Sequence, residues 1–366
     1  MIDLRSDALV PPSQEMWEAM RTAELGWALV GEDQSVNTLE ALAADILGKE
    51  AAIFVPTCSM ANLLALMTLG TRGTQVILES ASHMATTEAG SLAYVCGLLP
   101  RIIEGTAGYL DENKIERVIS VSRSGHLPRT TMVCLENSHN NAGGLAITSE
   151  QTEEAAEAAH RFGASVHLDG ARLFNSATAL HVPARKLTQH VDTVAISLNK
   201  GLCAPFGALL AGEQTVIAGV RENAWRIGAS SIHKAGLFAA AGIVALHTMV
   251  DRLAEDNLLA SQLAERIASV PGVEIVPENI RTNMVFMNTV ALGCNADTFL
   301  GLLARRGVLA WRTSEHRIRM VTHRGVSARD ITEVVPKVII EAAAECVLTG
   351  PEQGCHAARN LGAGVL

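Results

Sequence analysis

Two charged side chains follow apolar segments of the chain and could do chemistry together. Lys200 follows Thr193–Leu198 and Asp169 follows Ala164–Leu168, so each stands at the carboxyl end of a predicted strand. Open α/β sheets bind their ligands at this edge. Taken alone, Lys200 is more often an ordinary turn residue, and Asp169 more often forms a structural ion pair with Arg172. The argument for function therefore rests on the pair.

Together the two residues match what pyridoxal 5′-phosphate (PLP) requires of a protein. A lysine must reach the aldehyde carbon to form a Schiff base, and a carboxylate must keep the ring nitrogen protonated so that the ring can act as an electron sink. One helix-length crossover separates the two strand ends, so Lys200 and Asp169 can meet both demands. The other five of the six lysines fall on predicted surface helices, at a turn or in the loop Ser230–Ala235. We therefore expect PLP on Lys200.

A third segment, FVPTCSMAN, predicts a strand, a turn and the start of a helix. Thr57, Cys58 and Ser59 lie at the helix N-terminus, where free N–H groups and hydroxyls bind phosphate. A simple capped helix explains this segment better when it is taken alone.

Two of the twelve histidines could serve the same site. His83, in ASHMATTEAG, follows a strand and could lay its imidazole over a flat ring. His126, in SGHLPRT, lies in a loop and could reach a substrate hydroxyl. Each histidine by itself is more often structural, as we expect for His139, His160 and His167.

Composition excludes several classes of protein. The chain of 366 residues is 48% hydrophobic and only 18% charged, which suits a large domain plus a smaller one and favours an obligate homo-oligomer. The net charge of −9 and the lack of a basic cluster argue against a nucleic-acid partner. No apolar stretch approaches the roughly 20 residues that span a bilayer, and MIDLRSD does not resemble a signal peptide.

The seven cysteines are scattered and contain no C-x-x-C pair. A disulfide framework and a zinc site are therefore not expected, and we predict no metal site. This cysteine usage favours a reducing cytosol.

Short apolar segments alternate with helical patterns through the first two thirds of the chain, which predicts a mainly parallel α/β sheet. The expected strands are Ala51–Pro56, Gln75–Leu78, Met132–Glu136, Ala164–Leu168, Thr193–Leu198 and an antiparallel Gly207–Ala211. The expected helices of this part are Ser13–Thr22, Val36–Leu47, Ser59–Leu69 and Ser149–Phe162.

From about Gly236 the pattern changes to long helices and short strands, which predicts a small α+β domain. The expected elements are helices Leu237–Arg252, Asn257–Ser269, Thr298–Arg306 and Ala328–Leu348, with strands near Glu274, Val285 and Val308 and at Arg317–Val321. We place the N-terminal arm and large PLP-binding domain at residues 1–245 and the small domain at 246–366, with a mobile tail from about residue 350.

Many collinear segments resemble one family, the threonine aldolases and aromatic amino acid β-eliminating lyases. The matching segments are MIDLRSD, GEDQSVNTLE, GKEAAIFVPT, LENSHN, HLDGARLFN, SLNKGLCAPFGALLAG and RIRMVTH, which together span nearly the whole chain. The resemblance implies a fold-type I, PLP-dependent transferase-like fold with a mainly parallel, mixed seven-stranded sheet. It also implies a dimer with shared active sites, assembled into a tetramer.

For the cofactor, the resemblance implies that Lys200 forms the Schiff base, Asp169 pairs with the ring nitrogen and His83 stacks on the ring. Thr57 and Ser59 match the phosphate-binding turn of the family.

For the substrate, the resemblance implies retro-aldol cleavage of an L-β-hydroxy-α-amino acid to glycine and an aldehyde. Ser6 and Arg319 match residues that hold the substrate carboxylate, and Arg172 lies near that carboxylate or the ring hydroxyl. His126 matches a histidine near the β-hydroxyl. The base that removes the hydroxyl proton is left open between His83, His126 and an ordered water.

Five positions depart from the family pattern. Val30 stands where a tyrosine is usual, Cys58 where glycine is usual, and Asn199 where serine precedes the lysine. In GASSIHKAG, the residues His233 and Lys234 replace Met-Arg, whose arginine reaches the phosphate of the neighbouring subunit. We count His233 among the cofactor-binding residues and leave open whether the substrate is threonine-like or carries a different β-substituent.

Two other functions compete with the aldolase. An α,β-elimination, or another reaction at Cβ, would use the same fold and release ammonia and a keto acid. A non-catalytic relative would bind a metabolite or partner without the cofactor, and Lys200-dependent visible absorbance would exclude it.

Overall fold

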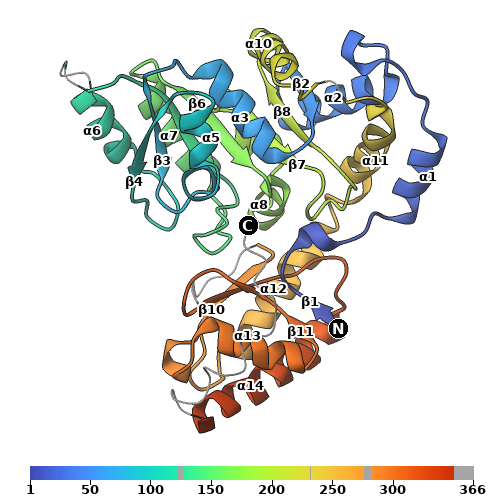
Figure 1. Ribbon diagram of the computed structural model, residues 1–366, viewed down its shortest axis with the longest axis vertical. Helices are drawn as coiled ribbons and strands as arrows, with labels where there is room; N and C mark the ends of the chain where they lie inside the picture. Colours follow the sequence, from blue (N-terminus) through green and yellow to red (C-terminus); the bar gives the residue numbers. More distant parts are fainter. Residues whose placement is uncertain (123–124, 126, 231, 276–281, 350–366) are drawn as a thin grey trace. The chain divides into compact units, whose positions relative to one another are not determined.

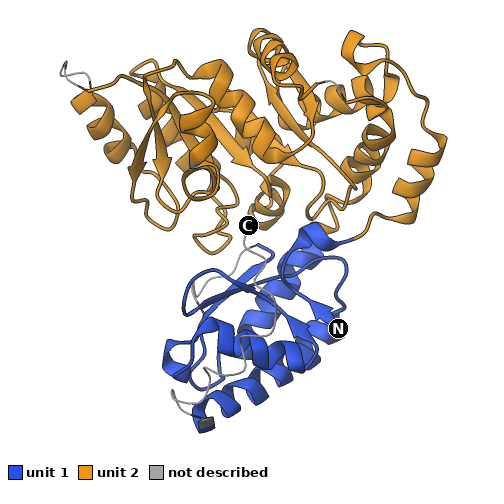
Figure 2. Ribbon diagram, in the orientation of Figure 1, with its two compact units in different colours: residues 1–10, 254–366 blue, residues 11–253 orange. Residues whose placement is uncertain are grey.

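The computed structural model describes residues 1–122, 125, 127–230, 232–275 and 282–349. Two compact units make up the chain: a large unit of residues 11–253 and a small unit of residues 1–10 and 254–366 (Figure 2). The sequence pattern placed the boundary at 245/246 and the N-terminal arm with the large domain. In the structure, β1 (Ile2–Asp3) pairs in parallel with β11 (Val308–Leu309), which groups the first ten residues with the small unit. The tail predicted from about residue 350 lies outside the described residues.

The large unit is built on a seven-stranded sheet of order β2-β8-β7-β6-β5-β3-β4 (Figure 1). β8 runs in the direction opposite to the other six strands of this sheet, which all point the same way. The prediction of a mainly parallel, mixed seven-stranded sheet is therefore confirmed. The strands are β2 (Ala51–Val55), β3 (Gln75–Glu79), β4 (Leu99–Ile103), β5 (Thr130–Glu136), β6 (Ser165–Gly170), β7 (Thr193–Ser197) and β8 (Ala208–Gly212).

The sequence pattern did not predict β4, which forms one edge of the sheet. Its segment LPRII is largely exposed and contains Pro100, which cannot donate a ladder hydrogen bond. An edge strand tolerates both features, so this strand lacks the buried apolar pattern that identified its neighbours.

Helices pack against the sheet and cover its apolar side chains. Residues of α3 and α10, such as Leu64 and Val220, form a buried cluster with Ile53, Ala195 and Leu210 of the strands. The helices of this unit are α1 (Gln14–Thr22), α2 (Gln34–Leu47), α3 (Cys58–Leu69), α4 (His83–Thr86), α5 (Ala89–Tyr94), α6 (Glu112–Ser122), α7 (Ser149–His160), α8 (Leu173–Leu180), α9 (Ala184–Thr188), α10 (Gln214–Arg226) and α11 (Ala235–Thr248).

α7 begins at Ser149, as predicted, but ends at His160 instead of Phe162. Thr148 caps it, because its hydroxyl accepts from the Gln151 N–H while the Gln151 side chain accepts from the Thr148 N–H. The single helix predicted over Ala328–Leu348 is instead a π-helical turn, Asp330–Val334, followed by α14 (Val335–Thr349). Pro336 lacks the N–H that a continuous α-helix would use there.

The small unit has an α+β arrangement of its own. Its four-stranded antiparallel sheet has the order β12-β13-β10-β9. Phe299, Leu263 and Ile339 of its helices pack with Val285 and Ile318 of its sheet in one core. The elements are β9 (Glu274–Ile275), β10 (Met284–Asn288), β12 (Trp311–Arg312), β13 (Arg317–Val321), α12 (Leu253–Ile267), α13 (Ala296–Arg305) and α14.

Among the described residues, no single helix has the length and apolar composition needed to cross a membrane. Helices α11 and α12 meet those criteria only when the two are counted together across the break between them.

Replacing Gly207 tests the packing and backbone conformation at the end of the loop between β7 and β8. It has φ +98°, its carbonyl accepts from the Leu198 N–H, and an added Cβ would lie 2.2 Å from the Phe54 ring. We expect Gly207→Ala to lower the free energy of unfolding by about 2 kcal/mol or more. Urea unfolding followed by circular dichroism measures this.

Gly301→Ala in α13 is the matched control, because a Cβ there meets nothing within 4 Å. This change should leave stability equal or raise it by up to about 1 kcal/mol. A Gly207→Ala protein as stable as the wild type would contradict the packing described.

Candidate active site

The carboxyl ends of neighbouring strands place the predicted lysine and aspartate at one edge of the sheet. β6 and β7 are adjacent and parallel, with Asp169 opposite Ala195. Lys200 lies in the bend five residues beyond Ala195, and its carbonyl accepts from the Cys203 N–H at 2.8 Å. The two residues therefore emerge from neighbouring strands at the same edge.

Asp169 is a buried carboxylate, 2% exposed, surrounded by donors. Its Oδ2 accepts from the Asn62 amide at 2.9 Å, and its Oδ1 accepts from the Ala171 N–H at 3.0 Å and from the Cys58 thiol at 3.7 Å. These donors hold the Asp169 carboxylate in place, where its oxygens can also accept a hydrogen bond from a ring N–H.

His83 approaches the same carboxylate from α4. Its Nδ1 lies 2.8 Å from Glu88 Oε1, and atoms of His83, Glu88 and Asp169 lie within 4.8 Å of one another. The hydrogen bond to Glu88 raises the pKa of His83, against the opposing effect of burial. Glu88 also accepts from Asn62 at 3.3 Å, so one amide links both carboxylates.

Two further buried acids hold the loop that carries His83. Glu136, at the end of β5, accepts from the His83 N–H and from the Asn140 N–H. Glu79, at the end of β3, accepts from the Ala81 N–H at 2.7 Å and lies 2.9 Å from His139 Nε2. Burial alone would raise the pKa of Glu79, but His139 and the backbone donors lower it to about 2.

The predicted phosphate-binding turn is the start of α3. Thr57 caps the helix by accepting from the Met60 N–H at 3.1 Å, and both Thr57 and Ser59 are exposed. Cys58 points to Asp169, and burial raises the pKa of its thiol well above the ordinary value. The charge of Lys200 opposes that shift, which places the lysine within electrostatic reach of the turn.

The remaining predicted residues lie at separate positions. Arg172 is buried at the N-cap of α8, three residues after Asp169. Ser6 and Arg319 lie in the small unit: Ser6 caps a short 3₁₀ helix, Asp7–Leu9, and Arg319 donates to the carbonyl of the adjacent Arg5 at 3.1 Å. His126 lies outside the described residues.

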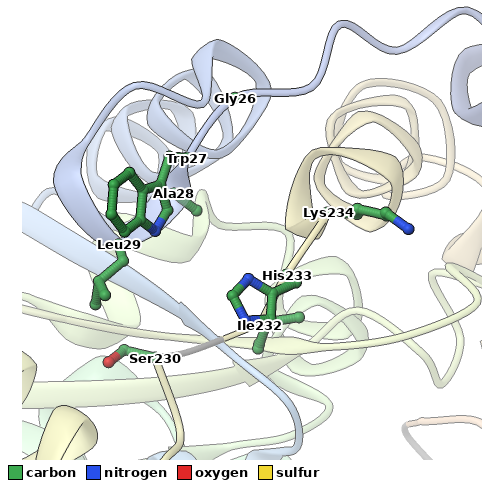
Figure 3. Close-up of a pocket in the computed structure, with 8 residues that line it drawn as sticks. All are labelled: Gly26, Trp27, Ala28, Leu29, Ser230, Ile232, His233 and Lys234. Atoms are coloured by element: carbon green, nitrogen blue, oxygen red, sulfur yellow. The ribbon is translucent and has the colours of Figure 1, made fainter.

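His233 lines a different cavity, of about 240 Å³, at the turn before α11. Its imidazole lies on the same side as Trp27 and Leu29, whereas the Lys234 side chain points away (Figure 3). Of the other positions that depart from the family pattern, Val30 is 53% exposed, and Asn199 accepts from the Ser197 hydroxyl at 2.8 Å.

Four residues of this site were missed by sequence reasoning: Asn62, Glu88, Glu136 and His167. Asn62 could have been found, because it lies four residues after Cys58 and so on the same face of α3. Glu136 ends the predicted strand Met132–Glu136 and Glu88 lies five residues after His83, so the reasoning applied to Asp169 and His83 could have found both. His167 was read as a structural histidine, and its contact with Asn62 joins residues 105 positions apart.

The chemistry of these residues fits PLP. A buried carboxylate surrounded by donors suits a protonated ring nitrogen, an adjacent strand end offers a primary amine, and the start of α3 offers N–H groups without intrahelical partners for a phosphate. Together with the fold, these features define a PLP-dependent enzyme of fold type I. The structure of a threonine aldolase from Leishmania major shares this fold, with a TM-score of 0.78 at 18% identity over 95% of this chain and all of that one.

Sequence comparison identifies the family. The family model described as "Beta-eliminating lyase" matches residues 3–290, and the chain belongs to this family. It is 37% identical to the low specificity L-threonine aldolase of Escherichia coli K12, over 91% of this chain and 97% of the relative. It is 35% identical to low-specificity L-threonine aldolase 1 of Arabidopsis thaliana, over 90% and 93%. The predicted family resemblance and PLP-dependent lyase class are confirmed.

Glu88→Gln tests the electrostatics of His83. Removing the charge of Glu88 removes the main cause of the raised pKa, so the His83 pKa should fall. An NMR pH titration of the His83 ring protons, assigned with a His83→Asn variant, measures the change. The exposed Glu150→Gln serves as the control, and an unchanged His83 titration in Glu88→Gln would contradict the pairing.

Proposed function

We propose that this protein cleaves L-β-hydroxy-α-amino acids, threonine-like in structure, to glycine and an aldehyde. The observation that carries the proposal is the convergence of Lys200, Asp169 and His83 at one sheet edge, in a chain 37% identical to an L-threonine aldolase. When bound, PLP supplies the electron sink that accepts the electron pair of the broken Cα–Cβ bond.

The large unit supplies the cofactor site in this proposal. Lys200 would hold the cofactor through a Schiff base of its Nζ, formed with release of water from the aldehyde, and Asp169 would accept the ring N–H. His83, held by Glu88, covers the ring face. The turn of Thr57, Cys58 and Ser59 holds the phosphate through hydroxyls and helix N–H groups.

Substrate binding and proton removal need further residues. We assign Ser6, Arg319 and Arg172 to the substrate carboxylate, because a guanidinium binds a carboxylate through two parallel hydrogen bonds. His83, His126 or an ordered water takes the β-hydroxyl proton. The ion pair with Glu88 makes His83 a stronger base when it is neutral, since it raises the pKa.

Elimination at Cβ is the second candidate function, and the family's name favours it. The two reactions share Lys200 and Asp169 but differ in products: aldol cleavage yields glycine and an aldehyde, whereas elimination yields ammonia and a keto acid.

Lys200→Ala and a substrate panel test the proposed reaction. We expect the wild type to show the visible absorbance of bound PLP and to release glycine and aldehyde from several β-hydroxy amino acids. Lys200→Ala should lose the absorbance and at least about 10³-fold in rate. The exposed Lys186→Ala should retain both. Bound PLP without cleavage of any panel member, or ammonia and keto acid as products, would overturn the aldolase.

We propose that a second copy of the chain covers an apolar face beside His233. Leu25, Trp27, Leu29 and Trp225 are 41–63% exposed there and border connected cavities. Such a face is typical of a subunit interface. His233 then serves the cofactor phosphate of the neighbouring subunit, and two such dimers form a tetramer.

Light scattering tests the assembly. The expected mass is four times that of the 38.7 kDa chain. The double change Leu29→Glu and Trp225→Glu should reduce it, because burying two new charges at an interface is costly. Trp311→Glu, at an exposed tryptophan of the small unit, is the control. A monomeric wild type, or an unchanged mass in the double variant, would contradict this face as the interface.

We also propose the cytosol as the compartment. The seven cysteines are scattered along the sequence, and the buried Cys134 and half-buried Cys58 have raised thiol pKa values, as expected of unreactive thiols in a reducing environment.

A further inference from the structure

Asn62 lies between two buried carboxylates that would otherwise repel each other. It is fully buried, and its Nδ2 donates to Asp169 Oδ2 at 2.9 Å and to Glu88 Oε2 at 3.3 Å. Asp169 and Glu88 are 2% and 9% exposed. Two carboxylates this close in a dry site tend to share a proton unless donors compensate their charge.

The amide must keep one orientation to act in this way. A half-turn about its terminal bond would exchange the NH₂ group for the carbonyl oxygen and present an acceptor to both acids. On its other side, Asn62 Oδ1 lies 3.0 Å from His167 Nε2. The amide therefore stays fixed only if that ring nitrogen carries a proton.

His167 has the environment needed to supply that proton. It is fully buried, and burial lowers its pKa to about 4, so it is neutral at pH 7 and holds one ring proton. Its Nδ1 lies 2.9 Å from the hydroxyl of Thr193, which can donate to it. With Nδ1 accepting from Thr193, the proton stays on Nε2 and faces Asn62.

We propose that Asn62 is a positioning residue, oriented by His167, that keeps Asp169 ionised for the cofactor's ring nitrogen and holds Glu88 on His83. The inference rests on the role given to Asp169 in the proposed function. Thr193, His167 and Asn62 are buried and joined by hydrogen bonds that lead from the start of β7, through β6, to the site. Replacing His167 or Thr193 should therefore change the hydrogen bond at the cofactor's ring nitrogen, although neither side chain contacts the cofactor.

His167 is the residue at which to test the orientation of Asn62, because its ring nitrogens hydrogen-bond to Thr193 and Asn62 and not to either carboxylate. In His167→Gln, the side-chain NH₂ can reach the place of Nε2 and still donate to Asn62. In His167→Leu no donor remains, so the amide can turn and Asp169 can share a proton with Glu88.

The experiment uses PLP alone, added to the apoprotein of the full chain. The readouts are the Kd for PLP and the downfield ¹H resonance of the ring N–H with ¹⁵N-labelled cofactor. We expect both to be near wild type in His167→Gln. In His167→Leu the resonance should disappear and the Kd should rise about ten- to a hundredfold. Losses of this size are typical when a residue that orients a metal ligand through a hydrogen bond is replaced.

An intact resonance and Kd in a folded His167→Leu, or equal loss in both variants, would overturn the proposal. If His167→Leu fails to fold, Thr193→Val and Thr193→Ser replace it, because valine keeps the shape of threonine without the hydroxyl. Thr193→Val should weaken the resonance and raise the Kd severalfold, whereas Thr193→Ser should not; equal behaviour would overturn the proposal. Neither readout requires substrate, so failure to cleave β-hydroxy amino acids would leave this test intact.

Discussion

Charge compensation around a buried carboxylate is the constraint on which the site depends. Asp169 is 2% exposed, so its charge is tolerated only because protein donors replace water. One donor is the Ala171 N–H of its own chain segment, and the others, Asn62 and Cys58, come from α3. The position of α3 against β6 is thus set by the same hydrogen bonds that prepare Asp169 for a ring nitrogen.

The same solution recurs along the sheet edge. Glu136 ends β5 and Glu79 ends β3, and each accepts backbone N–H groups from the loop around His83. A short helix such as α4, His83–Thr86, contributes little stability by itself. Hydrogen bonds to buried acids at neighbouring strand ends therefore stabilise this short helix, and they hold the His83 imidazole against Glu88.

Sequence patterns predicted those parts of the molecule whose cause is local. Strands such as Thr193–Ser197 are buried on both faces and read as apolar runs, and their ends correctly placed Lys200 and Asp169 at one edge of the sheet. β4 was missed because its edge position tolerates Pro100 and exposed residues. His167 was missed because its role depends on a contact with Asn62, which only the fold brings near it. The family resemblance supplied the reaction but not these contacts.

The attachment of the cofactor to Lys200 can be tested chemically. Borohydride reduces a Schiff base to a stable secondary amine, so reduction of the PLP-loaded protein, proteolysis and mass spectrometry locate the attachment point. We expect a pyridoxyl-phosphate adduct on the peptide that contains Lys200. An adduct on another lysine such as Lys234, or a loaded protein without an adduct at Lys200, would contradict it.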